Sequence, residues 1–337
     1  MINSYGSLSP IEAVKASGKL LAVGQPKMYL QRTGQTDDQP MNSTRTRKWR
    51  RYHSFPITKA PLAEGIAPAE QQLTYTDYVC VLQQYGSRYP ITDVVADTHT
   101  DPILQVLMTR GGEQAAKVTE VVTFDCLKGG TNVYFANNAA NRAAVNSPLT
   151  AGDVRRLLRQ FDRQYAQEIT EIISPSAKVS TAGVEGGYYA YAHTDIWNDL
   201  RKLSGFKTVV EYGDPSQALP GEKGAFERLR FILSPLYEPW YAAGTSGTTY
   251  LANTSAPSTS TACDVYPIVV VARDSYAVVR LQGKKAVKVM VHNPGQPAIG
   301  NELGQKGFVS WIMWYGCARL NEQWIARIEV ACTANPT

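Results

Sequence analysis

One cluster of residue types in this chain could bind a metal ion. Asp97, His99 and Asp101 alternate along the sequence, and Asp93 precedes them. Residues two apart share a face of a β-strand, so these carboxylates and the imidazole could converge on one cation. However, Asp101 stands directly before Pro102, and this pair is typical of a helix N-terminus. We therefore interpret Asp101 as a helix cap and predict neither a metal site nor a cofactor.

A second candidate pair, His193 and Asp195, has no nucleophile beside it in the sequence. A short helix near residues 194–204 explains Asp195 as an acid in the first turn, where the helix dipole favours negative charge. The chain also lacks a P-loop motif and a GxSxG nucleophile elbow. We therefore predict that the protein is not an enzyme.

The sharpest charge feature is the basic and aromatic run RTRKWRRYH at residues 45–53, with five basic residues between Arg45 and Arg51. Arginine interleaved with Trp and Tyr could grip phosphates and stack on bases. The run could also be a solvated basic loop, or a segment that reaches over a neighbouring subunit. Three prolines between residues 56 and 68 indicate a stiff, projecting loop or edge strand.

The composition permits a large buried core but supplies little net charge. The chain has 337 residues, of which 44% are hydrophobic, and a formal net charge of +5. A compact nucleic-acid-binding module would concentrate more charge. No apolar run approaches the roughly 20 residues that span a bilayer, and no signal peptide is visible at the N-terminus. The five cysteines are widely scattered, which favours free thiols in a reducing compartment.

A long helix is predicted over residues 101–130. Its apolar residues recur at helical spacing, and Gly129-Gly130 would end it. At about 1.5 Å per residue such a helix is about 40 Å long, which is unusual in a globular domain. Gly111-Gly112 inside it indicates a bend or a close contact.

A second helix is predicted from Thr150, which forms a capping box with Asp153, to Ile172, just before Ser174-Pro175. Two strands with a turn near residues 85–87 are predicted over residues 74–95, and strands predominate after residue 205. The fold class is therefore α+β with a large antiparallel component.

Several motifs resemble a known family in their order along the chain. They are RKWRRYHSFPITKAP from Arg47, LAEGIAP from Leu62, YTDYV from Tyr75, QYG from Gln84, ITDV from Ile91, DTHTDPIL from Asp97 and GEQAA from Gly112. This order resembles the major capsid proteins of tailed double-stranded DNA phages. It is most similar to the podovirus major capsid family whose phages carry a virion RNA polymerase. The resemblance is strongest over residues 30–130 and looser beyond residue 140.

The resemblance implies the tailed-phage major capsid fold, of the Hong Kong phage coat type. Such a fold has an N-terminal arm, an extended loop, a peripheral domain with a long spine helix, and an axial domain. The implied bounds are 1–44 for the arm, 45–73 for the extended loop, 74–144 and 262–337 for the peripheral domain with its spine helix at 101–130, and 145–261 mainly for the axial domain with a Gly/Ser/Thr-rich loop at 242–261.

The resemblance further implies a structural subunit that self-assembles as hexamers and pentamers into an icosahedral head. The head would enclose double-stranded DNA on its inner face, with portal, scaffold or decoration proteins as further partners and no membrane. The protein would be made in the bacterial host cytoplasm and reside in the virion.

The extended loop would supply the contacts between subunits. We expect Arg47, Arg50 and Arg51 to pair with acids of a neighbouring subunit, and Trp49 and Tyr52 to pack there. The chain has 19 Tyr and 6 Trp against 8 Phe, and we expect this excess to serve as anchors between subunits.

Two other functions stay open on the sequence alone. The first is a non-viral nucleic-acid-binding protein that grips its ligand with residues 45–53. The second is a carbohydrate-active protein that uses its Tyr and Trp side chains, for which no pair of carboxylates can be nominated.

Overall fold

The computed structural model describes most of the chain. The described residues are 28–59, 61, 64–65, 67–68, 70–98, 103–174, 183–214, 218–245, 250–252, 262–282, 287–297 and 300–334. The predictions for residues 1–27, for the Asp101-Pro102 cap and for most of the 242–261 loop lie outside these ranges. Within them, no helix is long and apolar enough to cross a membrane.

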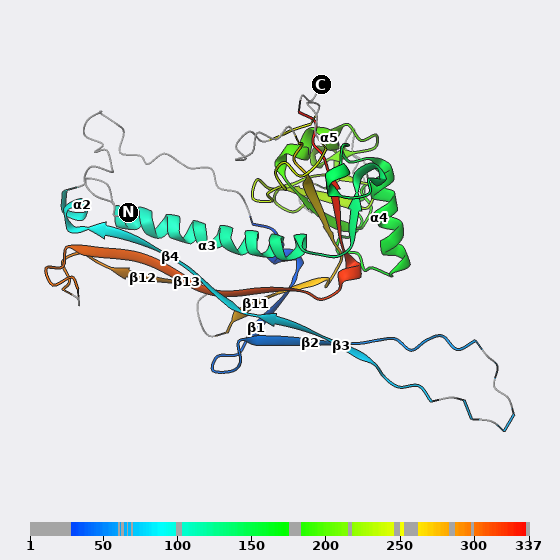
Figure 1. The fold of residues 1–337 in the computed structure, drawn as a ribbon, viewed down its shortest axis with the longest axis horizontal. Coiled ribbons are helices and arrows are strands. Elements are labelled where there is room, and N and C mark those ends of the chain that lie inside the picture. The colour runs from blue at the N-terminus through cyan, green and yellow to red at the C-terminus, as the bar shows by residue number, and fades with distance from the viewer. Residues whose placement is uncertain are drawn as a thin grey trace.

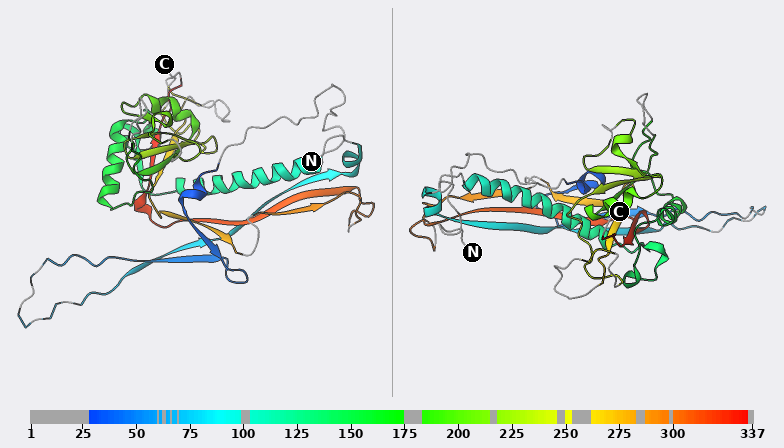
Figure 2. Two further views of the ribbon diagram at one scale, coloured as in Figure 1. Left: turned by 180° about the vertical axis from the view of Figure 1, so that it is seen from behind. Right: turned by 90° about the horizontal axis from the view of Figure 1, so that it is seen from above.

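The molecule has an elongated part and a globular part (Figure 1). In the elongated part the helix α3 (Ile103–Lys128) lies along a sheet of long strands, and in the globular part a second sheet packs with two helices. The views in Figure 2 show a thin two-stranded hairpin that projects away from both parts.

Helix α3 confirms the predicted long helix, with 26 residues. Gly111 makes the close contact that the glycine pair suggested, because a Cβ there would lie 3.2 Å from the Tyr89 ring and 3.3 Å from the Trp311 ring. Toward the end of the helix the buried face is partly polar. Thr119, Glu120 and Thr123 are buried there, whereas the sequence pattern predicted an apolar face throughout.

A five-stranded sheet supports α3. Its strands are β1 (Gln35–Gln39), β4 (Gln83–Thr92), β11 (Tyr276–Leu281), β12 (Lys288–His292) and β13 (Lys306–Arg319). The order is β1-β11-β13-β12, with β4 also paired to β13; β1 and β11 run parallel and the other pairs are antiparallel. Strand β13 alternates, and its buried residues Trp311, Met313 and Tyr315 pack with the helix or the core behind it.

Two details of residues 74–95 differ from the prediction. The turn expected near residues 85–87 is absent, because β4 continues through them in register with β13. The break between strands falls instead at Leu82, which is buried and donates its backbone N–H to the Arg45 carbonyl. A short helix α2 (Asp93–Thr98) then replaces the predicted end of the strand, and the Asp93 carboxylate accepts the Val94 N–H in its first turn.

The globular part contains a seven-stranded sheet. Its strands are β5 (Val133–Phe135), β6 (Tyr188–Ala192), β7 (Lys207–Thr208), β8 (Glu222–Phe226), β9 (Leu229–Leu233), β10 (Tyr266–Val271) and β14 (Ile325–Val330), in the order β5-β14-β10-β6-β9-β8-β7. Central strand β10 is buried on both faces: Ile268 and Val270 pack toward α4 (Ala151–Arg163), while Val269 and Val271 join the cluster that includes the end of α3. One core therefore connects the globular and elongated parts.

Helix α4 begins with the predicted Thr150–Asp153 capping box but ends earlier than predicted. Tyr165 adopts a positive φ of 52°, which an α-helix does not allow, and the chain leaves the helix there. Thr170 and Ile173 then form bridges with Gly187 and Val184. The shorter helix α5 (Trp197–Arg201), preceded by a 3-10 turn at Thr194–Ile196, accounts for the helix predicted near residues 194–204.

The two sheets share the last part of the chain. Strands β10 and β14 belong to the seven-stranded sheet, whereas β11, β12 and β13 belong to the five-stranded sheet. The boundary predicted at residue 262 therefore does not separate the two sheets. Residues 28–39, predicted as part of an arm, form helix α1 (Leu30–Thr33) and β1, which pack on α3 and β11 of the same chain.

The expectation that the tyrosine excess provides anchors between subunits is wrong for the tyrosines that the chain buries completely. Six of them are fully buried within this chain: Tyr188, Tyr191, Tyr212, Tyr237, Tyr276 and Tyr315. Their hydroxyls have internal partners, because Tyr237 donates to Glu120 at 2.6 Å and Tyr276 donates to the Leu30 carbonyl at 2.6 Å. These residues satisfy their polar groups inside the core.

Candidate functional site

The basic run identified in the sequence forms one strand of the projecting hairpin. Strand β2 (Thr46–Tyr52) pairs antiparallel with β3 (Tyr75–Val81), and the segment between them extends beyond the strands (Figure 1). Side chains of β2 alternate between half-buried and exposed along its whole length. The strand therefore has an inner face and an outer face with different surroundings.

The inner face of β2 carries Arg47, Trp49 and Arg51. The Trp49 ring packs on the small cluster of Cys80, Leu82, Val279 and Ala318 at the base of the hairpin. Arg47 donates from Nε to the Asp37 carboxylate at 2.8 Å. Arg51 lies over the Tyr78 ring, 5.0 Å from its centroid, and donates to the Tyr78 hydroxyl. This face attaches the hairpin to its own subunit.

The outer face carries Lys48, Arg50 and Tyr52, which stand opposite Val79, Asp77 and Tyr75. Asp77 lies between two cations, with Lys48 Nζ at 2.6 Å and Arg50 Nε at 2.9 Å from its oxygens. The Arg50 guanidinium also lies 4.0 Å from the Tyr75 ring centroid. The hydrogen bonds from Arg50 and then from Lys48 lower the pKa of Asp77 to about 2. We call Lys48, Arg50 and Asp77 the hairpin charge triad.

Large apolar side chains are exposed on the hairpin and on the segment beyond it. Tyr52 is 57% exposed, Tyr75 53% and Ile57 86%, and Phe55, Leu73, Val79 and Val81 are also exposed. Single exposed apolar residues are ordinary, but a gathering on one projecting element marks an interaction surface. The hairpin therefore presents apolar and charged groups that the described part of the chain leaves exposed to solvent.

The structure brings all five predicted contact residues onto one strand but gives them different roles. Arg47 and Arg50 already pair with acids of their own chain, where pairing with acids of a neighbour was expected. Trp49 packs internally, and only Tyr52 and Arg50 lie on the outer face. Sequence reasoning missed Ile57, Tyr75 and Val79. The alternation of residues 75–81 could have revealed the last two, since one face of a two-stranded hairpin has no sheet behind it.

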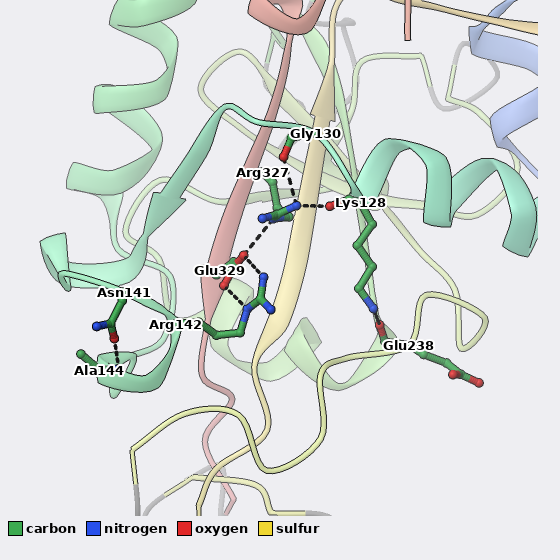
Figure 3. Close-up of polar contacts among 8 residues, drawn as sticks. All are labelled: Lys128, Gly130, Asn141, Arg142, Ala144, Glu238, Arg327 and Glu329. Carbon is green, nitrogen blue, oxygen red and sulfur yellow. Dashed lines mark hydrogen bonds and ion pairs between the residues drawn. The ribbon is translucent and has the colours of Figure 1, made fainter. Parts of the chain in front are cut away.

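A second cluster of charges lies where α3 meets the globular part (Figure 3). The buried Glu329 of β14 accepts two hydrogen bonds from Arg142, at 2.7 and 2.8 Å, and one from Arg327 at 2.8 Å. Arg327 also donates to the carbonyl of Lys128, the last residue of α3, and to that of Gly130, just beyond the helix. The Lys128 carbonyl has no partner within the helix, so the guanidinium satisfies it, and its positive charge stabilises the negative end of the helix dipole. We call Arg142, Arg327 and Glu329 the junction charge triad.

Trp240 covers the junction charge triad. The Arg142 guanidinium lies 3.6 Å from the centroid of its ring, and Lys128 Nζ and the Arg327 guanidinium lie 4.3 and 5.1 Å away. Burial lowers the pKa of both Lys128 and Arg327 from their usual values. This cluster fixes the end of α3 to the sheet, and nothing in the sequence pattern pointed to it.

Of the two candidate chemical sites, the Asp97 cluster lies partly outside the described residues, and the His193–Asp195 pair serves in helix capping. No group of three His, Cys, Asp or Glu side chains in the described ranges could hold a metal ion. His99 and Asp101 lie outside those ranges, and Asp97 is exposed on α2. The His193 ring accepts the Asp195 N–H at 3.2 Å as the cap of the following turn, and the Asp195 carboxylate accepts from the Tyr266 hydroxyl at 2.9 Å.

Solved structures with the same architecture are phage capsids. The capsid of Ralstonia phage GP4 matches with a TM-score of 0.68 over 100% of both chains, at 10% identity. The capsid asymmetric unit of cyanophage Pam1 matches with a TM-score of 0.62 over 96% of this chain and 98% of the other, at 9% identity. The chain therefore has the tailed-phage major capsid fold.

Sequence comparisons identify the family. A family model described as phage capsid protein matches residues 77–326, most of the chain, so the chain belongs to the phage capsid protein family. The major capsid protein of Pseudomonas phage KPP21 is 23% identical over 263 residues, which cover 74% of this chain and 66% of that protein, just under two thirds of its length. The chain is thus a structural protein of the phage capsid shell and not an enzyme, which excludes the non-viral and carbohydrate-active alternatives.

Proposed function

We propose that this chain is the major capsid subunit of its phage and assembles with copies of itself into hexamers and pentamers of an icosahedral head. The observation that carries the proposal is the projecting hairpin, whose outer face exposes Tyr52, Tyr75 and Val79 beside the hairpin charge triad. In a shell every subunit has neighbours at fixed positions, so a projecting surface of this kind is repeated at each contact. Many moderate contacts then add through multivalency.

Within this proposal the hairpin with residues 45–73 is the extended loop. Helix α3 is the spine helix, and the five-stranded sheet belongs with it to the peripheral domain. The seven-stranded sheet, including β5, β10 and β14, forms the axial domain, which changes the predicted bounds to follow the two sheets. Residues 28–39, which pack on α3 and β11, form the attached end of the N-terminal arm.

The same proposal includes the contents of the head, its partner proteins, its place of synthesis and its source. The head encloses double-stranded DNA on its inner face, which a net charge of +5 permits without strong attraction or repulsion. Portal, scaffold and decoration proteins are its other partners, and synthesis takes place in the host cytoplasm. As part of the same proposal, the motif order of residues 30–130 supports a source among podoviruses that carry a virion RNA polymerase.

The decisive experiment reverses charge on the hairpin. The double variant Lys48→Glu, Arg50→Glu, which reverses the two cations of the outer face, should stay folded by circular dichroism but assemble poorly by size-exclusion chromatography and negative-stain microscopy. The reason is that glutamate at residue 50 repels Asp77 and places negative charge on the contact surface. Normal shells from this variant would refute the assignment of the hairpin as the contact.

A matched control is available on α4. Arg155→Glu with Arg159→Glu reverses two exposed charges of the globular part, outside the hairpin. Shells that form from this control but not from the hairpin variant would attribute the defect to the hairpin rather than to net charge. Salt-dependent DNA binding by a subunit that stays small would instead indicate a nucleic-acid-binding function for residues 45–53.

A further inference from the structure

A cavity of about 200 Å³ lies between helix α3 and the five-stranded sheet. One of its walls is the stretch of α3 from Gly112 to Thr119, and the others come from α1, β11 and β13 and from Val287 just before β12. For comparison, a cavity of about 150 Å³ can hold a benzene molecule. None of the lining residues belongs to the hairpin or to the junction charge triad, so the cavity is separate from both sites described above.

One end of the cavity is apolar and the other is polar. At the apolar end, Met313 of β13 packs on Ala115 of α3, with Val287 beside them. At the polar end, Arg280 of β11 stands opposite Tyr315, which lies two residues from Met313 along β13. A ligand that spans the cavity therefore meets apolar groups at one end and a guanidinium at the other.

Arg280 is the charged residue of the cavity lining. The other polar side chains at this end are used within the chain, because the Thr119 hydroxyl accepts from the Gln31 amide and the Tyr315 hydroxyl shares a hydrogen bond with Thr123 at 2.6 Å. In the described part of the chain, the half-buried Arg280 side chain makes one hydrogen bond, to Gln31 Oε1 at 2.8 Å, and no ion pair. A guanidinium has five N–H donors, so several remain for an anion.

Gly112, at the exposed edge of the cavity, is a second observation that points to a ligand. Glycine inside a helix is less stable than alanine, so its presence needs a reason. A Cβ at Gly112 would meet no described atom within 4 Å, unlike one at Gly111, and the φ of Gly112 is not positive. Neither packing nor backbone conformation within the described chain therefore requires this glycine, whereas a larger side chain there would fill part of the cavity.

We propose that the cavity is a binding site for a small apolar carboxylate, of the size of benzoate or hexanoate. The carboxylate accepts hydrogen bonds from the Arg280 guanidinium, whose planar shape matches it, and the ring or chain lies against Ala115 and Met313. The surrounding side chains exclude part of the water, which strengthens the ion pair. A bound ligand connects α3 with β11 and β13. The site goes beyond the proposed function and does not depend on assembly.

The test uses the full unassembled chain, labelled with carbon-13 in the methionine methyl groups. The chain has 6 methionines, and Met313→Leu assigns the NMR resonance of Met313 by its loss. Benzoate or hexanoate should shift this resonance in a saturable way and leave that of Met290, exposed on β12, unchanged. Benzamide has the same shape without the charge. Its dissociation constant should be about tenfold higher than that of benzoate, because hydrogen bonds to charged groups are stronger.

Three results would overturn the proposal. The first is a Met313 resonance that neither carboxylate shifts, and the second is equal affinity for benzoate and benzamide. The third is a Met313 shift that depends on the concentration of the subunit alone, because a second copy of the chain would then occupy the cavity.

Matched variants locate the site. Arg280→Gln should weaken benzoate binding about tenfold and leave benzamide binding unchanged, whereas Arg159→Gln, which removes an exposed arginine of α4, should change neither. Gly112→Phe should abolish the binding of both by filling the cavity, and Gly112→Ala should retain it, since a Cβ at this residue meets no described atom. Circular dichroism checks that each variant is folded. Because the Gly112 variants leave Arg280 in place, they test the site even if Arg280→Gln does not fold, and full binding by Gly112→Phe would contradict it.

Discussion

The hairpin charge triad and the junction charge triad have the same composition, one carboxylate between two cations, in opposite settings. In the hairpin, the side chains of Lys48 and Arg50 are 52% and 43% exposed. At the junction, the Glu329 side chain is fully buried and that of Arg327 is 9% exposed. Water screens the first triad and is excluded from most of the second.

This difference separates a surface that can exchange partners from one that cannot. An exposed ion pair gains little over its hydrated ions, so its groups can exchange their partner for one on another subunit at small cost. Removing one member of a buried triad leaves a charge without water or partner, which is strongly unfavourable. The hairpin is therefore suited to assembly, and the junction to holding α3 on the globular part.

The largest expected effect comes from removing the buried carboxylate. Glu329→Ala should lower the free energy of unfolding of the isolated subunit by about 3–5 kcal/mol, because Arg327 stays buried without its acid. Urea unfolding followed by circular dichroism measures the change. The matched control, Asp77→Ala, removes the carboxylate of the exposed triad and should lower the unfolding midpoint much less. Equal losses of unfolding free energy from the two variants would contradict the difference drawn between the buried and the exposed charge triad.

A smaller effect should separate the two faces of β2. Trp49→Ala removes a half-buried ring from the cluster at the hairpin base and should cost about 2 kcal/mol of unfolding free energy. Tyr52→Ala on the outer face should leave stability unchanged but reduce shell yield. Denaturant unfolding and negative-stain counting of shells measure the two outcomes.

Phenylalanine is the matched control at residue 49. Among the described residues, the buried Trp49 indole N–H has no hydrogen-bond partner, so Trp49→Phe removes an unsatisfied donor and keeps a ring in the cluster. It should retain most of the stability that alanine loses. If instead Tyr52→Ala destabilises the subunit and Trp49→Ala does not, the inner and outer faces have been assigned the wrong way round.

The sequence predicted the parts of the fold that local patterns determine. The long helix and the capping box at Thr150 follow from periodicity and caps, and the structure has them. The end of α4 could not be predicted, because apolar residues continue at helical spacing to Ile172 while the backbone turns at Tyr165. A single residue with positive φ is set by tertiary contacts rather than by composition.

The candidate site was predicted only in part, for a related reason. Residues 45–53 were identified by their charge, but charge alone could not show that Arg47 and Arg50 have acids of their own chain opposite them. In β14, Arg327 and Glu329 alternate with apolar residues, which indicates a strand with one solvated face. Both are buried, because β10 and the end of α3 meet there. Such contacts depend on the packing of distant segments, which a single sequence does not reveal.

The smallest effect is a titration in the hairpin charge triad. The pKa of Asp77 should be about 2 in the folded subunit, below the ordinary value of 3.8, because Arg50 and then Lys48 donate to its ionised form. Because its pKa is lowered, the ionised carboxylate stabilises the hairpin when the pH is above the ordinary Asp pKa of 3.8. This contribution is lost as the pH falls from about 4 toward about 2. Carbon-13 NMR of the Asp77 carboxyl measures the midpoint.

Two variants and a change of salt concentration test the cause of the lowered Asp77 pKa. Arg50→Gln should return the Asp77 midpoint further toward the ordinary value than Lys48→Gln does, since the Arg50 hydrogen bond is the larger cause. About 1 M salt should also move the midpoint upward by a smaller amount, because it shortens the Debye length to about 3 Å, which is comparable with the lengths of these exposed ion pairs. If the Asp77 titration midpoint changes neither with salt nor with Arg50→Gln, Asp77 is shielded from water. The hairpin charge triad would then resemble the junction charge triad, and its charges would not be free to exchange with those of another subunit.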